Sequence, residues 1–369
     1  MDIESPRPES LDVLVIGGGQ AGLAMGYHLR QRGLTFVILD AAPELGSAWR
    51  SRWDSLRLFT PAEFDALPGT PFPAPAGSYP GKDQVADYLT AYAEIHALPL
   101  RLATRVTRLQ RVDDGFLAET TAGDVRARQV VVAAGPFQRP YTPNVSASLA
   151  ASVHQLHSAE YRNPGQLPPG SRVLVVGGGN SGLQIAAELA ESHEVTLSIG
   201  SRPPRLPQRL FGRDLFFWLD RTGLMRVRST SRLARRIQAK GDVVIGSSLR
   251  ALRARGVQVR PRLTDASGRS AEFEDGAVVE VDAVVWATGY RPDYRWIDVE
   301  GVVVDGAIRH ENGFTDVAGL HVLGLPWQTT RGSALLGFVA ADAELLADAI
   351  NATAVRPRPR GSRSDAAVL

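Results

Sequence analysis

The sequence contains no cysteine. Disulfide bonds, thiolate nucleophiles, cysteine-ligated zinc and iron–sulfur clusters are therefore excluded, and so is a reductase that works through a redox-active pair of cysteines. An unbroken apolar run of membrane-spanning length is also missing. The apolar segment that begins at Leu11 is interrupted by the glycines from Gly17 to Gly19, and the residues before it do not form a signal peptide. We expect a cytoplasmic protein with no membrane among its partners.

What is present is the composition of a globular protein large enough for two domains: 369 residues, 44% of them hydrophobic and 22% charged. The formal net charge is only +2. We take the positive charges to be spread along the chain, so a nucleic acid is not an expected partner. Histidine and carboxylate residues show no metal-ligand spacing, so no metal is expected. Residues 1–10 and 353–369 lack apolar periodicity, which predicts mobile tails.

Between these tails, short β-branched runs alternate with helical segments, a pattern typical of an α/β fold with a parallel sheet. One strand-and-glycine motif occurs twice. Val13 to Ile16 runs into Gly17-x-Gly19-x-x-Gly22, and Val173 to Val176 runs into a second copy that starts 160 positions later (177 − 17). This distance leaves room for one complete nucleotide-binding unit. The duplication predicts two Rossmann-like domains and two dinucleotides.

In the first copy, Gly17 permits a tight turn, Gly19 lets the backbone approach a pyrophosphate, and Gly22 allows close packing of helix on strand. The pyrophosphate would lie at the N-terminus of the helix that follows. A second strand ends at Asp40, 18 residues beyond Gly22 (40 − 22), where a carboxylate can accept hydrogen bonds from a ribose. The residues of this copy predicted to bind a cofactor are Gly17, Gly19, Gln20, Ala21, Gly22 and Asp40.

The strand that follows the second glycine motif ends differently from the strand that ends at Asp40. This strand, Val195 to Ile199, runs into Gly200, Ser201 and Arg202, and an arginine at this place can pair with a 2′-phosphate. NADPH is therefore favoured over NADH. The predicted cofactor contacts of this copy are Gly177, Gly179, Asn180, Ser181, Gly182, Ser201 and Arg202.

Two other apolar strands end in small residues that let backbone approach a ligand closely. One runs from Val130 to Gly135 and the other from Ala283 to Tyr290. A buried strand followed by a plain turn is the alternative for either segment alone. We count Ala134, Gly135, Thr288 and Gly289 as cofactor-binding candidates.

Taken together, the sequence resembles the flavin-containing monooxygenase superfamily, in particular its small bacterial members and the plant YUCCA-type enzymes. The resemblance covers nearly all of the chain between the tails. It rests on the two glycine motifs and on further segments: Gly46 to Trp49, Leu56 to Pro73, Tyr79-Pro80, Ala287 to Tyr290 and Gly324 to Pro326.

The resemblance implies a discontinuous FAD-binding domain (residues 11–150 and 285–352) with an NADPH-binding domain (160–284) inserted into it. It also implies that Trp49 and the segment from Trp327 to Gly337, including Gln328 and Leu335, contact the flavin. A further family motif matches at His157, Tyr161 and Arg162 but departs at Ala151 and Val153, and the role of His157 stays open.

By resemblance, NADPH reduces FAD, and the reduced flavin takes up molecular oxygen as a C4a-(hydro)peroxide that oxygenates a small organic substrate. Two alternatives remain open at this stage. One is an NADPH-dependent flavin reductase that passes electrons to a quinone, a ferredoxin or another acceptor. The other is a non-catalytic flavoprotein that senses redox state.

Overall fold

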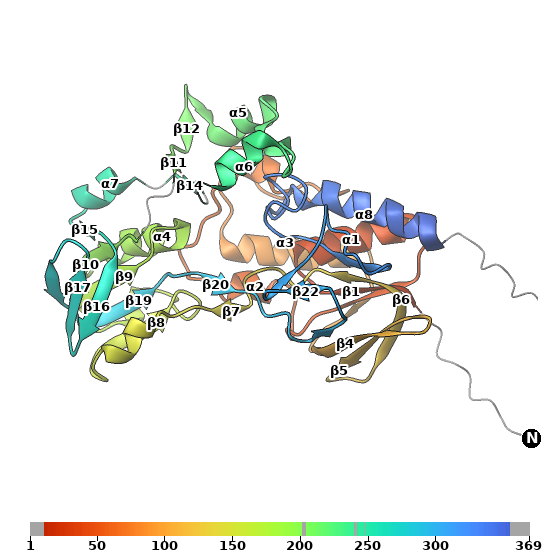
Figure 1. Ribbon diagram of the computed structural model, residues 1–369. Helices are drawn as coiled ribbons and strands as arrows, with labels where there is room; N and C mark the ends of the chain where they lie inside the picture. The colour runs from red at the N-terminus through yellow and green to blue at the C-terminus, as the bar shows by residue number, and fades with distance from the viewer. Residues whose placement is uncertain (1–10, 201–203, 240, 242, 247, 355–369) are drawn as a thin grey trace, which may run out of the picture.

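The computed structural model of Figure 1 describes residues 11–200, 204–239, 241, 243–246 and 248–354. Two α/β units lie beside each other, each built on its own mainly parallel sheet, and a smaller lobe stands above them. The fold class expected from the sequence is confirmed. Ser201, Arg202 and the predicted tails up to residue 10 and from residue 355 lie outside the described residues.

The first unit is an eight-stranded sheet with the order β21-β4-β5-β6-β1-β2-β3, and β24 pairs with β6 beside it. Strands β1, β2, β3, β6 and β24 are parallel, while β4, β5 and β6 form an antiparallel meander. The strands are β1 (Leu11–Ile16), β2 (Phe36–Leu39), β3 (Leu100–Arg101), β4 (Val106–Val112), β5 (Gly115–Thr120), β6 (Val125–Val132), β21 (Ile297–Asp298) and β24 (Leu320–Val322).

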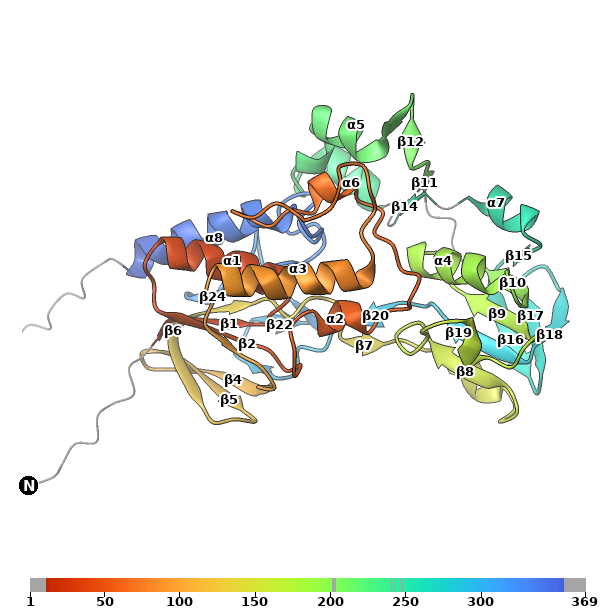
Figure 2. The same cartoon turned by 180° about the vertical axis from the view of Figure 1, so that it is seen from behind.

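Alternation along β1 produces two cores, because successive side chains of a strand point to opposite faces of the sheet. Val13 and Val15 pack into the core beneath the helices, whereas Leu14 and Ile16 pack into the core on the other face. Helices cover the first of these faces (Figure 2). They are α1 (Gln20–Gln31), α3 (Lys82–Ile95) and α8 (Val339–Ala354). Since α8 continues to Ala354, the predicted start of the tail at 353 is two residues too early.

The second unit is an all-parallel sheet with the order β15-β10-β9-β19-β8. Its β9 alternates as β1 does: Val173 and Val175 face the core under α4, and Leu174 faces the core under a three-stranded antiparallel sheet. Its elements are β8 (His154–His157), β9 (Arg172–Val176), α4 (Asn180–Leu189), β10 (Glu194–Ser198), α7 (Leu249–Ala254), β15 (Gln258–Arg260), β16 (Leu263–Ser267), β17 (Ser270–Phe273), β18 (Val278–Glu280) and β19 (Ala283–Trp286).

Two short strands, β7 (Arg139–Pro140) and β20 (Tyr290–Arg291), pair antiparallel where the chain crosses between the units (Figure 1). The two sheets do not divide at residues 160 and 285, the predicted boundaries of the inserted domain. Strand β8 precedes the first of these boundaries, and the second falls inside β19. The cause is that two crossing segments, rather than the glycine motifs, define the edges of the inserted unit.

The lobe consists of residues 204–245, which leave the second unit after β10 and return before α7. It contains β11 (Arg205–Leu206), β12 (Arg209–Leu210), β13 (Arg213–Asp214), α5 (Leu215–Arg221), the 3-10 helix η4 (Leu224–Arg226), α6 (Arg232–Gln238) and β14 (Val244–Ile245). Across the described ranges, no helix combines the length and the apolar character needed to cross a bilayer.

Candidate functional site

The first glycine loop joins β1 to α1 and is shaped by its contacts with the chain itself. Gly17 has φ +116°, and a Cβ atom there would overlap the carbonyl group of Ala133 at the end of β6. A Cβ on Gly22 would overlap the carbonyl oxygen of Gly17. Gly19 differs from both, because a Cβ there would meet nothing within 4 Å. Close packing against the backbone explains why positions 17 and 22 require glycine. The open space at Gly19 instead fits the close approach of a ligand.

Asp40 follows β2 directly and fixes this loop. Its Oδ2 accepts a hydrogen bond from the Gly18 N–H (2.6 Å), and its Oδ1 accepts one from the Ala42 N–H (2.8 Å). Each carboxylate oxygen can accept a second hydrogen bond. The carboxylate is thus held beside the glycine loop, in the position predicted for the ribose contact.

The second glycine loop, between β9 and α4, repeats this geometry. Gly177 has φ +137°, and its Cβ would overlap the carbonyl of Ala287 at the end of β19. A Cβ on Gly182 would overlap the carbonyl oxygen of Gly177, and one on Gly179 would meet nothing within 4 Å. Neither α1 nor α4 has a side-chain cap or an acidic residue in its first turn. Both helix N-termini are therefore suited to an anion.

The two sites differ at the ribose position. The Gly17 N–H donates to the Leu39 carbonyl, and the Gly177 N–H donates to the Ser198 carbonyl. Asp40 is therefore matched in the second unit by the buried Ile199. The second site has no carboxylate at this position to repel a 2′-phosphate.

An arginine that the sequence analysis missed lies beside this position. The Arg262 guanidinium donates to the Gly200 carbonyl (2.9 Å), two residues before Arg202 in the chain. Arg262 follows β15, which pairs parallel with β10, so the sheet brings the ends of the two strands together. Arg262 is exposed, and its planar guanidinium suits a phosphate. No local sequence signal marks it, because its partner strand is 60 residues away (258 − 198).

The strand ends proposed as cofactor contacts lie at the mouths of the two loops. The Ala133 N–H donates to the Ile16 carbonyl, so Ala134 and Gly135 continue past the first loop, and Ala134 is exposed. In the same way the Ala287 N–H donates to the Val176 carbonyl. Both strand ends are thus placed as the sequence predicts.

The residues after Ala287 also join the two units. The hydroxyl of Thr288 donates to the Tyr141 carbonyl, and the Gly289 carbonyl accepts from the Tyr141 N–H (3.0 Å). Thr288 and Gly289 therefore have structural partners in addition to their place at the second loop.

His157 has a structural role in this geometry. It is 4% exposed, its Nε2 contacts the Gly289 carbonyl (3.1 Å), and its Nδ1 accepts from the Ala159 N–H (3.1 Å). These partners require a neutral ring protonated at Nε2. Burial lowers the pKa of His157 below its ordinary value, and the Gly289 carbonyl opposes this. Both ring nitrogens are therefore engaged with backbone groups, and His157 is held at the crossing between the units.

Tyr161 and Trp49 are packing residues of the same region. Tyr161 is fully buried, and its hydroxyl donates to Glu188 on α4 (2.8 Å). Trp49 lies on the short helix α2 (Ser47–Arg50) and packs against both the core of the first unit and that of the second. The structure therefore places Trp49 between the two units, where the flavin contact is predicted.

The C-terminal loop before α8 reaches the first glycine loop. A Cβ on Gly324 would lie 2.8 Å from the Cβ of Ala21 in α1. Gln328, a predicted cofactor contact, is 2% exposed, and its Oε1 accepts from the Leu325 N–H (3.4 Å). The buried Gln328 side chain thus stabilises the turn that begins at Leu325. Leu335, in the same loop, lines a cavity.

This cavity, of about 270 Å³, lies where the first unit, the second unit and the lobe meet. Its walls include Leu335 and Trp327 from the C-terminal loop, Asn180 from the second glycine loop, and side chains of α5, η4 and α6. Apolar groups dominate the lining, and the polar side chains in it are Asn180 and Arg331. Asn180 is itself held in place, because its Oδ1 accepts from the Ile245 N–H (3.1 Å). The cavity therefore connects predicted contacts of both cofactors.

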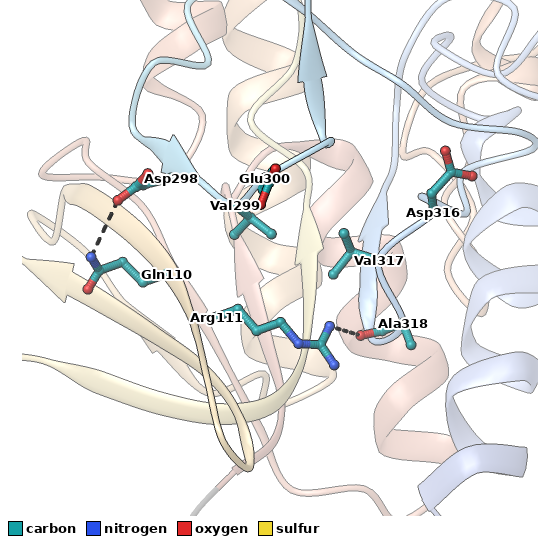
Figure 3. Close-up of a pocket in the computed structure, with 8 residues that line it drawn as sticks. All are labelled: Gln110, Arg111, Asp298, Val299, Glu300, Asp316, Val317 and Ala318. Atoms are coloured by element: carbon teal, nitrogen blue, oxygen red, sulfur yellow. Dashed lines mark hydrogen bonds between the residues drawn. The ribbon is translucent and has the colours of Figure 1, made fainter.

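A second, more open hollow lies elsewhere on the first unit (Figure 3). It is lined by Asp298, Glu300 and Asp316 together with Gln110 and Arg111. The Arg111 guanidinium donates to the Ala318 carbonyl, and Gln110 donates to Asp298. This hollow is on β4 and β21 at the sheet edge, away from both glycine loops. We assign the chemistry to the cavity and not to this hollow.

The residues present fit both nucleotide cofactors. In the first unit an open Gly19, an uncapped helix N-terminus and the fixed Asp40 carboxylate suit a pyrophosphate and an adjacent ribose. In the second unit an open Gly179, an uncapped α4, the absence of a carboxylate at Ile199 and the nearby exposed Arg262 suit a nucleotide with an additional phosphate.

Comparison with known proteins agrees with this geometry. A model of the pyridine nucleotide-disulphide oxidoreductase family matches residues 14–316. The chain belongs to this family. Because it has no cysteine, it cannot reduce a disulfide through a cysteine pair of its own.

Individual relatives show which members of this family the chain is similar to. The chain is 46% identical to an uncharacterized CzcO-like oxidoreductase of Geobacillus kaustophilus, over 91% of this chain and 97% of the relative. It is 30% identical to the indole-3-pyruvate monooxygenase YUCCA8 of Oryza sativa, over 78% of each. A flavin-containing monooxygenase from Stenotrophomonas maltophilia superimposes with a TM-score of 0.79 at 33% identity, covering 94% of this chain and 100% of that one.

These matches confirm the expected membership in the flavin-containing monooxygenase superfamily. The protein is a flavin-dependent oxidoreductase, and its cofactors are FAD and NADPH.

Proposed function

We propose that the protein is a monooxygenase that consumes NADPH and oxygenates a small, largely apolar organic substrate. FAD lies on the first glycine loop and NADPH on the second. The cavity between them is the observation that carries this proposal, since it joins Asn180 of the NADPH loop to Leu335 of the C-terminal loop within an apolar lining. Bound FAD would supply hydride acceptance and the activation of oxygen.

The chain's own residues have three tasks in this reaction. The glycine loops and Asp40 hold the two nucleotides, and Asn180, fixed by β14, closes the NADPH side of the cavity. Apolar side chains such as Phe216 and Met225 exclude water, which protects a reactive oxygen species from unproductive decay. A catalytic acid–base pair is not required for these tasks, because the cofactors carry the reacting atoms.

The lining also bears on the substrate. Its rings, including Phe59, Phe137 and Phe216, favour an apolar or aromatic body.

Rapid mixing tests the reaction class. The holoenzyme is reduced with NADPH without oxygen and is then mixed with oxygenated buffer. The proposal predicts a transient absorbance distinct from both the reduced and the oxidised flavin. Direct return to the oxidised spectrum without a transient would instead identify a reductase that passes its electrons to another acceptor.

A further inference from the structure

Charge is distributed very unevenly in this chain. Residues 204–245, called the basic lobe from here on, contain nine arginines and one lysine against three aspartates, a net charge of +7. Since the whole chain carries +2, the remainder carries −5. The expectation that positive charges are spread along the chain is therefore wrong. A strongly basic segment on an otherwise acidic protein indicates an anionic partner.

The basic lobe also projects from the molecule. In Figures 1 and 2 it stands at the top, away from both sheets, with β12 and α5 side by side and α6 below them. Eight of its arginines are exposed: Arg209, Arg213, Arg221, Arg226, Arg228, Arg232, Arg235 and Arg236. Among the described residues of the basic lobe, the ion pair found is that of Arg226 with Asp220 (3.0 Å). Most of this charge is thus available to a partner.

The tip of the β12–β13 hairpin carries an aromatic residue in an unfavourable setting. Phe211 is 92% exposed and has φ +50°, and Gly212 after it has φ +77°. Two central residues with positive φ form the tight hairpin turn in which asparagine and glycine are preferred. A bulky residue there is strained, and its exposed ring adds an unfavourable contact with water. Both costs point to a role for Phe211 outside the folding of the chain.

Other apolar groups accompany the tip. The Phe211 ring lies edge-on against Trp218 of α5 (6.2 Å between ring centres), and Arg213 lies over the ring of Phe217 (4.5 Å). On α6, Leu233 is 48% exposed among arginines. Aromatic and leucine side chains next to exposed arginines are the composition of a surface that lies in the interface of an anionic membrane.

We propose that the outer face of the basic lobe docks on an anionic lipid surface, with Phe211 entering the headgroup layer. Arginines attract acidic headgroups, and the ring of Phe211 gains from leaving water. This peripheral contact is not a membrane span, and the proposal departs from the expectation that no membrane is among the partners.

Two other occupants fit these observations less well. A second copy that docked basic lobe to basic lobe would bring like charges together across the contact. A nucleic acid would neutralise the arginines, but its phosphate backbone would give Phe211 and Leu233 no apolar environment.

The inner face of the basic lobe connects the proposed docking with the cavity. Leu219 of α5, Met225 of η4 and Ile237 of α6 line the cavity described above. The elements that would lie on the membrane therefore also line the cavity in which an apolar substrate is expected. Apolar substrates concentrate in membranes. This link rests on the proposed function, whereas the docking is measured without turnover.

Vesicle sedimentation of the holoenzyme tests the proposal. One set of vesicles is phosphatidylcholine alone, and the other contains phosphatidylglycerol as well. We expect sedimentation with the second set only, weakened by added salt. Absence of binding to the anionic vesicles, or equal binding to both sets, would overturn the proposal. Tighter binding to a DNA or RNA oligonucleotide than to anionic vesicles would also overturn it.

Matched variants locate the contact. Phe211→Asn suits the turn and should weaken vesicle affinity about tenfold with unchanged FAD content and melting temperature. Replacing Arg232, Arg235 and Arg236 by glutamine should weaken it on the order of a hundredfold, at about fivefold for each arginine. The control replaces three exposed arginines of the first unit, Arg105, Arg126 and Arg309, by glutamine. Equal losses in the triple variant and its control would show that only net charge matters and would contradict docking through the basic lobe.

Discussion

Asp40 and Gly18 are joined by a 2.6 Å hydrogen bond from the Gly18 N–H to the Asp40 Oδ2. The bond ties the end of β2 to the loop after β1, so the carboxylate that would contact the FAD ribose also supports the loop that would contact the pyrophosphate. In the second unit Ile199 holds the matching position and makes no such bond through its side chain. The two nucleotide sites therefore share one loop geometry and differ in charge.

Replacing Asp40 by asparagine keeps the size of the side chain and removes its charge. We expect the affinity for FAD to fall about thirtyfold, because a hydrogen bond to a charged group contributes on the order of 2 kcal/mol. Dialysis of the purified variant followed by measurement of retained flavin checks this. Asp113→Asn, an exposed residue of the β4–β5 turn, is the control and should retain FAD as the parent does. Equal retention in both variants would remove Asp40 from the FAD site.

Arg262→Gln tests whether Arg262 recognises the 2′-phosphate of NADPH. The guanidinium is held at Gly200 by the bond to its carbonyl, and its loss should raise the KM for NADPH about tenfold while the KM for NADH changes little. Arg253→Gln on α7 removes an exposed arginine of the same unit and should leave both values unchanged. Equal increases for the two nucleotides would show that Arg262 does not discriminate between them. Arg202→Ala, predicted from the sequence, should have the same selectivity.

Met225→Gln tests the exclusion of water from the cavity. Glutamine is close to methionine in size but carries an amide that attracts water. The transient species of the oxygen reaction should decay about tenfold faster in this variant, with more hydrogen peroxide released per NADPH oxidised. Met25→Gln is the control, because Met25 is equally buried in α1 but does not line the cavity. A normal transient lifetime in Met225→Gln would contradict the proposed role of the lining.

Asp65 predicts a pH dependence of stability. The residue is completely buried, and its Oδ1 accepts from the Thr60 hydroxyl (2.5 Å). Burial raises the pKa of Asp65 from 3.8 to about 7, although the Thr60 hydroxyl opposes this. The folded protein therefore binds a proton that the unfolded chain releases near pH 4. The resulting stabilisation is complete below about pH 4 and is lost as the pH rises through 7.

Asp65→Asn should remove that dependence. The amide cannot ionise, so the wild type should lose on the order of 1 kcal/mol per pH unit between about pH 4 and 7 relative to the variant. Urea unfolding of the two holoproteins at several pH values measures the difference. Parallel stability curves would show that Asp65 is ionised in the folded protein.

The sequence alone was sufficient for features that are local in the chain. The strand, the glycine loop and Asp40 lie within 30 residues of one another, and the structure places all three as predicted. Gly177 and Ala287 likewise repeat the contact of Gly17 with Ala133.

Features assembled from distant segments could not be predicted in this way. Arg262 reaches Gly200 only because β15 pairs with β10, and the cavity combines residues from Phe59 to Leu335. The two partners of the His157 ring also needed the structure, because one of them, the Gly289 carbonyl, lies 132 residues further along the chain. The basic lobe projects from the molecule because of where it leaves and rejoins the second unit, which only the structure shows.

The assignment of one cofactor to each glycine loop is tested most directly by a pair of alanine variants. Gly19 and Gly179 have φ −74° and −82°, which alanine adopts freely, and a methyl group at either position meets no protein atom within 4 Å. Both variants should therefore fold. We predict that Gly19→Ala loses FAD, whereas Gly179→Ala retains FAD and shows a raised KM for NADPH in flavin reduction. Full FAD content in Gly19→Ala, or an unchanged KM for NADPH in Gly179→Ala, would contradict the assignment.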